Sequence, residues 1–363
     1  MTRFLLVLIF AFGAQIIQPL LAQDTYQYQA GNITVPPASS KEAKAEFSIE
    51  RAVKHLNDGA IAWSKQKKCV SCHTNGSYLF VRPALSKSLG KPSDEMRNFF
   101  VEQLESFKKI GARKLKRSGT RPAQVIYIAA GLAEWDAHVT KKLSAETDAA
   151  LRLTFEIQNQ EGTWHSLTCW PPFESSAFHE ATVAAMAAAT APGWLKGLKP
   201  DDPVLKNVEA LKKYVRETSP PHAYGRVLRL WTSLRMDGIL TAEQQQEVVA
   251  LIQSKQQSDG GWSIRQFAKP EEWGGGNRAE KIRQEKDFEN PASDGHMTGL
   301  ALLVLDAAGV AKKDARMKKG IDWIKSNQRA SGRWWTQSLN TEKWHFITYS
   351  GTAYSLLAIQ NAE

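Results

Sequence analysis

One sequence pattern returns along this chain: an apolar helical segment, then a glutamine, a short gap, a glycine and a tryptophan. Three copies end at Gln160–Trp164, Gln257–Trp262 and Gln328–Trp334, and residues 59–66 form a degenerate fourth. The pattern accounts for the high count of 12 tryptophans. Internal repeats of this kind are typical of stacked helical pairs.

Each repeat predicts two helices joined by a tight turn. The glycine permits the turn, the glutamine amide can satisfy backbone groups at the helix end, and the tryptophan packs over it. The spacing of the copies predicts weaker repeats near residues 100–117 and 208–222. Alanine-rich second helices are expected at Ala181–Ala191, Thr298–Ala308 and Thr352–Ile359. About six pairs closing on themselves predict an all-α fold, an (α/α)6 toroid, with the small-residue helices inside.

These features resemble the prenyltransferase and squalene-cyclase repeat superfamily, whose QW motifs look like the turns described above. The likeness is best over Lys319–Trp334 and extends over roughly residues 45–361. It implies an (α/α)6 barrel with a central cavity, formed by one domain at residues 45–363. Such a likeness identifies a fold better than an activity.

Two signatures of the superfamily's enzymes are missing from the sequence. Class II triterpene cyclases use a D-x-D-D motif, whereas Asp201-Asp202 has Lys199 two positions before it. Protein prenyltransferase β subunits hold zinc with Asp, Cys and His; His345 resembles the site of that His, but no D-x-C precedes it. We therefore do not expect classical terpene cyclisation.

The degenerate first repeat is followed by Cys69-Val70-Ser71-Cys72-His73, the C-x-x-C-H signature of covalent c-type haem attachment. Two thiolates can form thioether bonds to the porphyrin, and His73 can bind the iron. The combination with the repeat resembles a group of exported bacterial toroid proteins. Other readings stay open: a disulfide, a relic of a lost haem site, or zinc or copper held by this Cys pair and histidines.

The N-terminus carries the features of a secretory signal over residues 1–22. Arg3 precedes the apolar run from Phe4 to Phe12, and Ala22 gives a small residue before expected cleavage at Gln23. An uncleaved anchor is the alternative. Residues 23–44 are expected to be a flexible lead-in. We expect a periplasmic or secreted bacterial protein, a compartment in which haem c is attached.

Histidines precede the predicted inner helices and should gather at one mouth of the toroid. These are His73, His179, His222, His296 and His345. With His73 as the proximal iron ligand, the second ligand could be His179, His222, His296 or Met297, or the position could be open. The alternative is that these histidines cap the N-termini of the inner helices or form hydrogen bonds around the turns. Polar residues expected at the same mouth, as candidates for substrate contact or as solvated rim residues, are Asn75, Arg82, Glu174, Glu180, Asp294 and Tyr349.

The net charge of +10 favours acidic partners, such as a redox partner protein or an anionic membrane surface. We expect no nucleic-acid partner, because no such module is recognisable. Residues 265–293 form a long insert, read as a lid, a partner contact or a disordered decoration.

The first functional hypothesis is a haem c redox or electron-transfer protein. The second is an enzyme or binding protein for an apolar, isoprenoid-like ligand in the central cavity, with Asp294 or His296 involved and the CxxCH structural or metal-binding. The third is a scaffold that keeps the fold without chemistry. The remaining cysteine, Cys169, is either a core thiol or a reactive site.

Overall fold

The computed structural model describes residues 27–117, 119–168, 170–173, 175–341 and 345–362. The predicted signal at residues 1–22, Cys169 and Glu174 lie outside the described residues. The fold is all-α apart from one small hairpin, in agreement with the sequence prediction.

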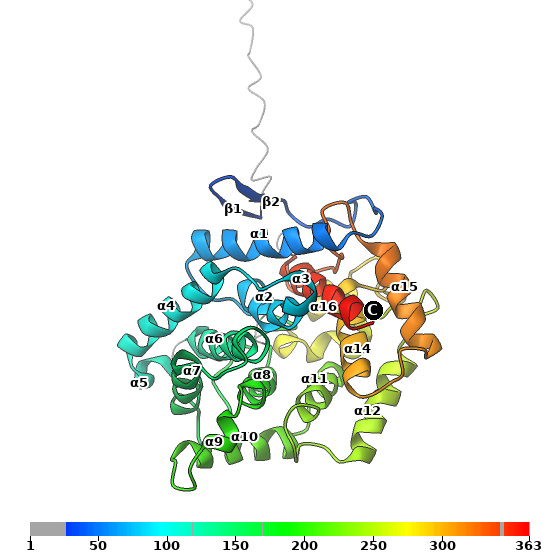
Figure 1. Cartoon of the computed structure of the whole chain (residues 1–363). Coiled ribbons are helices and arrows are strands. Elements are labelled where there is room, and N and C mark those ends of the chain that lie inside the picture. The colour runs from blue at the N-terminus through cyan, green and yellow to red at the C-terminus, as the bar shows by residue number, and fades with distance from the viewer. Residues whose placement is uncertain (1–26, 118, 169, 174, 342–344, 363) are drawn as a thin grey trace, which may run out of the picture.

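Six of the described helices form an inner set whose members contact one another in a closed cycle. In order of contact they are α2 (Asn75–Val81), α6 (Arg121–Trp135), α8 (Ala177–Thr190), α11 (Ala223–Ser233), α14 (Gly295–Ala307) and α16 (Phe346–Ala362). The last of these packs against the first, so the cycle closes (Figure 1). Their residues are mostly buried on every side, which explains their small and apolar composition.

A second set of helices lies around the first (Figure 1). These are α1 (Ile49–Lys67), α4 (Asp94–Ile110), α7 (Ala145–Glu156), α10 (Val204–Glu217), α12 (Ala242–Ser254) and α15 (Ala315–Asn327). Each buries one face and exposes the other. Helices α4 and α10 overlap the two stretches, 100–117 and 208–222, where the sequence predicted weak repeats, and each begins a few residues before its stretch.

Short elements connect these helices. They are η1 (Arg82–Leu85), α3 (Ser86–Leu89), α5 (Ala112–Leu115), η2 (Asp136–Thr140), α9 (Trp194–Gly197), η3 (Ile264–Phe267), η4 (Pro270–Glu272), η5 (Gly274–Gly276) and α13 (Ala279–Arg283).

The repeated turn has one hydrogen-bond pattern in its three clear copies. The indole N–H of the tryptophan donates to the carbonyl ten residues earlier: Trp164 to Thr154, Trp262 to Ile252, and Trp334 to Ile324, at 2.8, 2.7 and 2.8 Å. In each copy, the acceptor of this N–H is therefore a backbone carbonyl in the last turn of the outer helix.

The glutamine of each turn joins neighbouring repeats. Gln158 Nε2 donates to Gly162 and Asn207, Gln256 Nε2 to Gly260 and Arg316, and Gln328 Nε2 to Gly332 and Ser48. The sequence interpretation named Gln160 and Gln257 for the first two turns. The prediction was wrong by two residues in the first turn and by one residue in the second. Both stretches contain neighbouring polar residues that sequence alone cannot tell apart.

The turn glycine allows a close approach between repeats. Gly332 has φ +92°, and a Cβ there would lie 2.3 Å from the Arg51 carbonyl oxygen at the start of α1. Any side chain at this position would separate the last repeat from the first. The turn therefore contributes directly to closing the cycle.

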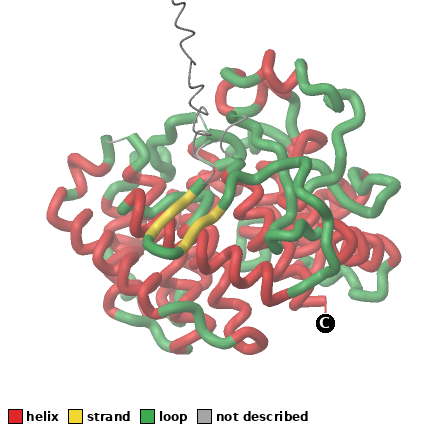
Figure 2. The backbone as a smooth tube through the Cα atoms, turned by 90° about the horizontal axis from the view of Figure 1, so that it is seen from above, coloured by secondary structure: helices red, strands yellow, loops and turns green. Residues whose placement is uncertain are grey.

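The segment expected to be a flexible lead-in is, from residue 27 onward, packed against the helices. Strands β1 (Tyr28–Ala30) and β2 (Ile33–Val35) pair antiparallel beside α1, and Figure 2 shows them lying across the helices. Glu42 accepts hydrogen bonds from Ser331 N and Arg333 Nε. The prediction failed because the apolar residues that fix this segment, Tyr28 and Val35, are too few to give a periodic signal.

The insert at residues 265–293 is packed against the body of the molecule rather than disordered. Arg265, nearly buried, pairs with Glu285 and donates to the carbonyls of Gln337 and Ser338. Arg278 Nε donates to Asn340 Oδ1 at 2.8 Å. The insert thereby supports the loop that precedes α16.

Candidate functional site: a pocket at the CxxCH loop

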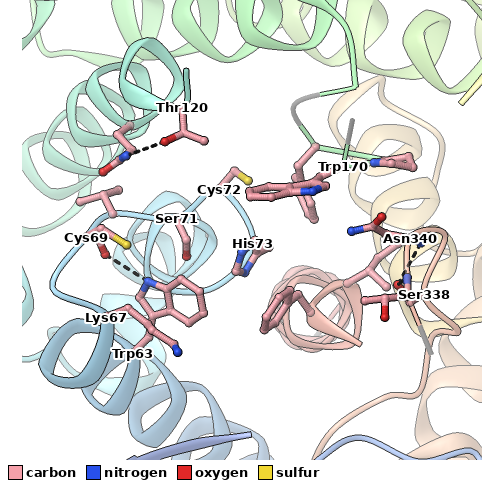
Figure 3. Close-up of a pocket in the computed structure, with 17 residues that line it drawn as sticks. Trp63, Lys67, Cys69, Ser71, Cys72, His73, Thr120, Trp170, Ser338 and Asn340 are labelled. Carbon is pink, nitrogen blue, oxygen red and sulfur yellow. Dashed lines mark hydrogen bonds between the residues drawn. The ribbon is translucent and has the colours of Figure 1, made fainter. Parts of the chain in front are cut away.

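A pocket of about 500 Å³ lies where the CxxCH loop meets the starts of α6 and α16. Figure 3 shows Cys69, Ser71, Cys72 and His73 along one side, with Trp170, Ser338 and Asn340 across from them. Its walls are mainly apolar and aromatic, and come from Trp63, Val70, Trp170, Pro171, Phe173, Phe346 and Ile347. Both cysteines of the motif and its histidine line this one cavity.

The loop carrying the cysteines is held by side-chain to backbone hydrogen bonds. Helix α1 ends at Lys67, and the next residue, Lys68, adopts the left-handed conformation that turns the chain into the loop. Asn75, fully buried, accepts from Ser71 N at 2.8 Å and donates to the carbonyl of Cys69 at 3.0 Å. Ser77 Oγ donates to the carbonyl of Cys72 at 2.6 Å. The backbone of the motif is therefore fixed by the first turn of α2.

His73 lies in an aromatic box. Its ring stacks on Phe346 with centroids 4.1 Å apart and meets the edge of Trp63 at 4.8 Å. Nδ1 lies 2.7 Å from Thr74 Oγ1. Burial lowers the pKa of His73 to about 3, so its ring is neutral at ordinary pH. A neutral imidazole with Nδ1 engaged leaves Nε2 as the nitrogen that can bind a metal.

The two cysteines differ in burial. Cys69 is half-buried beside the end of α1, and its carbonyl accepts from Trp63 Nε1 at 3.1 Å. Cys72 is 4% exposed, and it interacts electrostatically with Tyr127 and Tyr354 of the inner helices. Cys69 therefore lies nearer the surface, and Cys72 lies deeper in the molecule.

The rim of the pocket is polar and basic. Ser338, Asn340 and Thr341 line it on one side and Lys67 on another. Lys67 and Lys68 are exposed, and both flank the CxxCH loop. The N-termini of α6 and α16 also end at this pocket, and helix N-termini carry partial positive charge. This mouth therefore favours a ligand with an apolar body and anionic groups at its edge.

The four candidate second iron ligands are not among the pocket-lining residues. His179 Nε2 lies 3.1 Å from the Tyr127 hydroxyl. His296 is fully buried, with Nε2 3.0 Å from the Tyr224 hydroxyl and Nδ1 3.0 Å from Ser350 Oγ. These contacts hold both rings in the centre of the helix cycle, behind Phe173, which packs against each of them edge-on.

The remaining histidines and Met297 have structural contacts. His222 is the N-cap of α11, accepting from Gly225 N at 3.1 Å, and its ring packs on Trp273 of the insert. His345 Nδ1 accepts from Ser338 N at 2.9 Å. Met297 is fully buried in the core. The alternative thus holds for His222, which caps a helix, and for His345, which forms a hydrogen bond within the turn that precedes α16.

Asp294 also serves the fold. It caps α14 by accepting from Met297 N at 2.8 Å and also accepts from Ile264 N at 2.6 Å and from Thr336 Oγ1 at 3.3 Å. Burial raises its pKa to about 6. The carboxylate of Asp294 therefore links neighbouring turns through three hydrogen bonds. This structural role weakens the hypothesis that Asp294 acts on an apolar substrate.

Other predicted polar neighbours are dispersed around the fold. Arg82 donates to the carbonyls of Leu89 and Gly90 beyond the far end of α2. Glu180 accepts from Ser166 Oγ, and Tyr349 donates to the carbonyl of Leu56. Among the members of this set that the structure describes, Asn75 acts directly on the CxxCH loop.

Sequence reasoning did not name the pocket's far wall. Trp170, Phe173 and Phe346 come from loops and a helix start distant in sequence from the cysteines. The signal available in the sequence was Trp170, which lies outside the repeated Gln–Gly–Trp pattern and directly precedes Pro171-Pro172.

Within the described residues, no group of three or more His, Cys, Asp or Glu is arranged to hold a metal ion, so the zinc or copper alternative gains no support there. None of the described helices combines the length and hydropathy needed to cross a bilayer. No protein-family model matches the chain, and no curated protein matches it in sequence.

Proposed function

We propose that this chain is an exported, c-type haem-binding redox protein, with the haem in the pocket beside the CxxCH loop. The observation that carries the proposal is that Cys69, Cys72 and His73 line one cavity. We also assign the closed helix cycle and its surrounding helices to an (α/α)6 toroid of the QW-repeat type. The indole and glutamine bonds of the repeated turns support that assignment.

The residues present fit a haem. The cavity of about 500 Å³ lies within the range of small-molecule and cofactor sites, about 300–1,000 Å³. Its aromatic walls suit a flat apolar macrocycle, and its rim of Lys67, Ser338, Asn340 and Thr341 suits carboxylates. The cysteines offer the attachment points at one wall.

A bound haem would supply one-electron transfer at its iron. The chain's own residues perform three tasks around it. Cys69 and Cys72 attach the group, His73 presents a neutral Nε2, and Phe346 with Trp63 fixes the plane of that imidazole. Trp170 and Phe173 close the opposite side and exclude water from the apolar wall. His179, His222, His296 and Met297 do not line the pocket, so the proposal assigns none of them to the iron.

An acidic redox protein is the partner that the rim favours. Lys67 and Lys68 border the loop that would carry the haem, and both are exposed. Long-range attraction between this basic rim and an acidic surface would speed encounter.

A second candidate function is binding of an apolar ligand in the same pocket, with the cysteines structural. The four aromatic side chains that line the pocket favour binding of an apolar ligand. The centre of the helix cycle offers less support, because Tyr224, His296 and Tyr354 contact one another there.

A pyridine haemochrome spectrum tests the proposal on protein expressed in a periplasm with haem c maturation machinery. We expect a c-type spectrum that is lost in Cys69→Ala/Cys72→Ala and retained in the matched control Cys169→Ala. A wild-type protein without the spectrum under these conditions would overturn the haem proposal and favour the apolar-ligand candidate.

A further inference from the structure

On the side of the His73 ring that faces away from the pocket, Nδ1 is the first member of a buried chain of hydrogen bonds. Nδ1 lies 2.7 Å from Thr74 Oγ1, Thr74 Oγ1 lies 3.1 Å from the Tyr28 hydroxyl, and that hydroxyl lies 3.3 Å from the Gln27 side-chain amide. All four residues are at most 8% exposed. Any group left without a partner here would therefore cost free energy.

Every member of the chain can both donate and accept. In one direction the Gln27 amide donates to Tyr28, Tyr28 to Thr74, and Thr74 to Nδ1, which places the imidazole proton on Nε2. In the other direction Nδ1–H donates to Thr74, Thr74 to Tyr28, and Tyr28 to the amide oxygen of a rotated Gln27. In both directions, every hydrogen bond from Gln27 to His73 has a donor and an acceptor.

We propose that Thr74 and Tyr28 are positioning residues for His73, because their reversible hydrogen bonds can accommodate either imidazole tautomer, including the one with its proton on Nδ1 that would leave Nε2 free to bind the iron. The inference rests on the proposed haem function. Metal binding at Nε2 needs that nitrogen deprotonated, and a hydrogen bond at Nδ1 fixes the ring and raises its basicity. The chain meets both needs without leaving a buried polar group unpaired.

Tyr28 is held where this role requires it. Its ring stacks on Phe346 with centroids 6.1 Å apart and meets Trp63 edge-on at 5.5 Å, so it shares both walls of the His73 box. Burial raises the pKa of Tyr28 above its ordinary value, which keeps the phenol protonated and able to donate. The N-terminal hairpin is thus part of the site.

Nitrogen NMR of ¹⁵N-histidine-labelled apoprotein tests the chain without any haem. In the wild type we expect Nε2 to carry the proton and Nδ1 to resonate as an unprotonated nitrogen with a hydrogen bond. Thr74→Val should shift the Nδ1 resonance to that of a nitrogen without this bond, and Thr74→Ser should restore it. A wild-type Nδ1 that carries the proton, or a Thr74→Val spectrum equal to the wild type, would overturn the inference.

The midpoint potential of the haem-loaded protein tests the second direction of the hydrogen-bond chain, in which Nδ1–H of His73 donates to Thr74. Tyr28→Phe leaves Thr74 without an acceptor when Nδ1 donates, so His73 becomes a weaker ligand and the potential should rise. The control Tyr78→Phe removes another buried hydroxyl, which donates to Asn57 Oδ1 at 2.7 Å, and should leave the potential unchanged. Equal potentials in all three proteins would contradict the role of Tyr28. Failure of haem to attach to the wild type would instead reject the proposed function, while the apoprotein spectra still test the Thr74 bond.

Discussion

At the residue scale, the site depends on a few buried polar side chains that fix one loop. Asn75 joins Ser71 and Cys69 by its amide, and Gly76 lets the backbone of Ser71 approach α2. The sequence named the two cysteines and His73 because the motif is local. It could not assign Asn75 or Thr74 a role, because short polar side chains near a helix start have many possible partners.

Gly76→Ala should disrupt this loop. The added Cβ would lie 2.3 Å from the Ser71 carbonyl oxygen, so the loop must move. We expect a loss of about 1–3 kcal/mol in the free energy of unfolding and lower haem attachment. The matched control is Gly197→Ala, where nothing lies within 4 Å of the new Cβ. Guanidinium denaturation measures both variants, and equal stability of the two would contradict the account of this contact.

Buried neutral histidines should make the fold sensitive to acid. Burial lowers the pKa of His55, His179 and His296 to about 3 each, from an ordinary value of 6.5. Between these values the unfolded chain binds more protons than the folded one, so stability present above about pH 6.5 is lost as the pH falls. Asp294 acts in the opposite sense between its ordinary value of 3.8 and about 6, but it is one group against these three histidines and also His73 and His222, whose pKa burial lowers to about 3 and about 4.

The free energy of unfolding at about pH 7 and about pH 5 checks this dependence. We expect lower stability at the acidic value and a smaller difference in His296→Gln. Exposed His165→Gln serves as the control, with a difference equal to that of the wild type. Stability that is unchanged or higher at the acidic value would show that these rings are not buried as neutral groups.

At the element scale, the repeated turn is the unit that the sequence predicted best. The tryptophan was found in all three clear turns, whereas the glycine of the middle turn is Gly260, with φ +92°, and not the predicted Gly261. The glutamine was misplaced in two turns, because only the fold decides which amide meets the next outer helix. Gln328, named correctly, joins the end of α15 to the start of α1.

Gln328→Ala should weaken the closure of the helix cycle. Its fully buried amide donates to the carbonyls of Ser48 and Gly332 and accepts from Ser48 N. We expect a loss of about 1–3 kcal/mol, since these backbone groups lose their partner. Exposed Gln246→Ala in α12 should change stability little. Thermal denaturation compares the two, and a Gln328→Ala protein as stable as the control would argue against the closing role of this turn.

At the scale of the whole molecule, helical periodicity and the repeats were enough to predict an all-α fold. The packed hairpin and the ordered insert were not predictable, because both are held by single buried residues such as Tyr28, Val35 and Trp273. For the same reason, only one of the two walls of the pocket could be predicted from the sequence. The motif gave one wall, whereas Trp170, Phe173 and Phe346 reach the other wall only because the chain closes on itself.

The central claim is that this pocket holds a covalently attached haem, and mass spectrometry of the mature protein tests it most directly. We predict an intact mass equal to the processed polypeptide plus one haem, with the added mass on the peptide containing Cys69 and Cys72. A protein of plain polypeptide mass, after expression with haem c maturation machinery, would contradict the account.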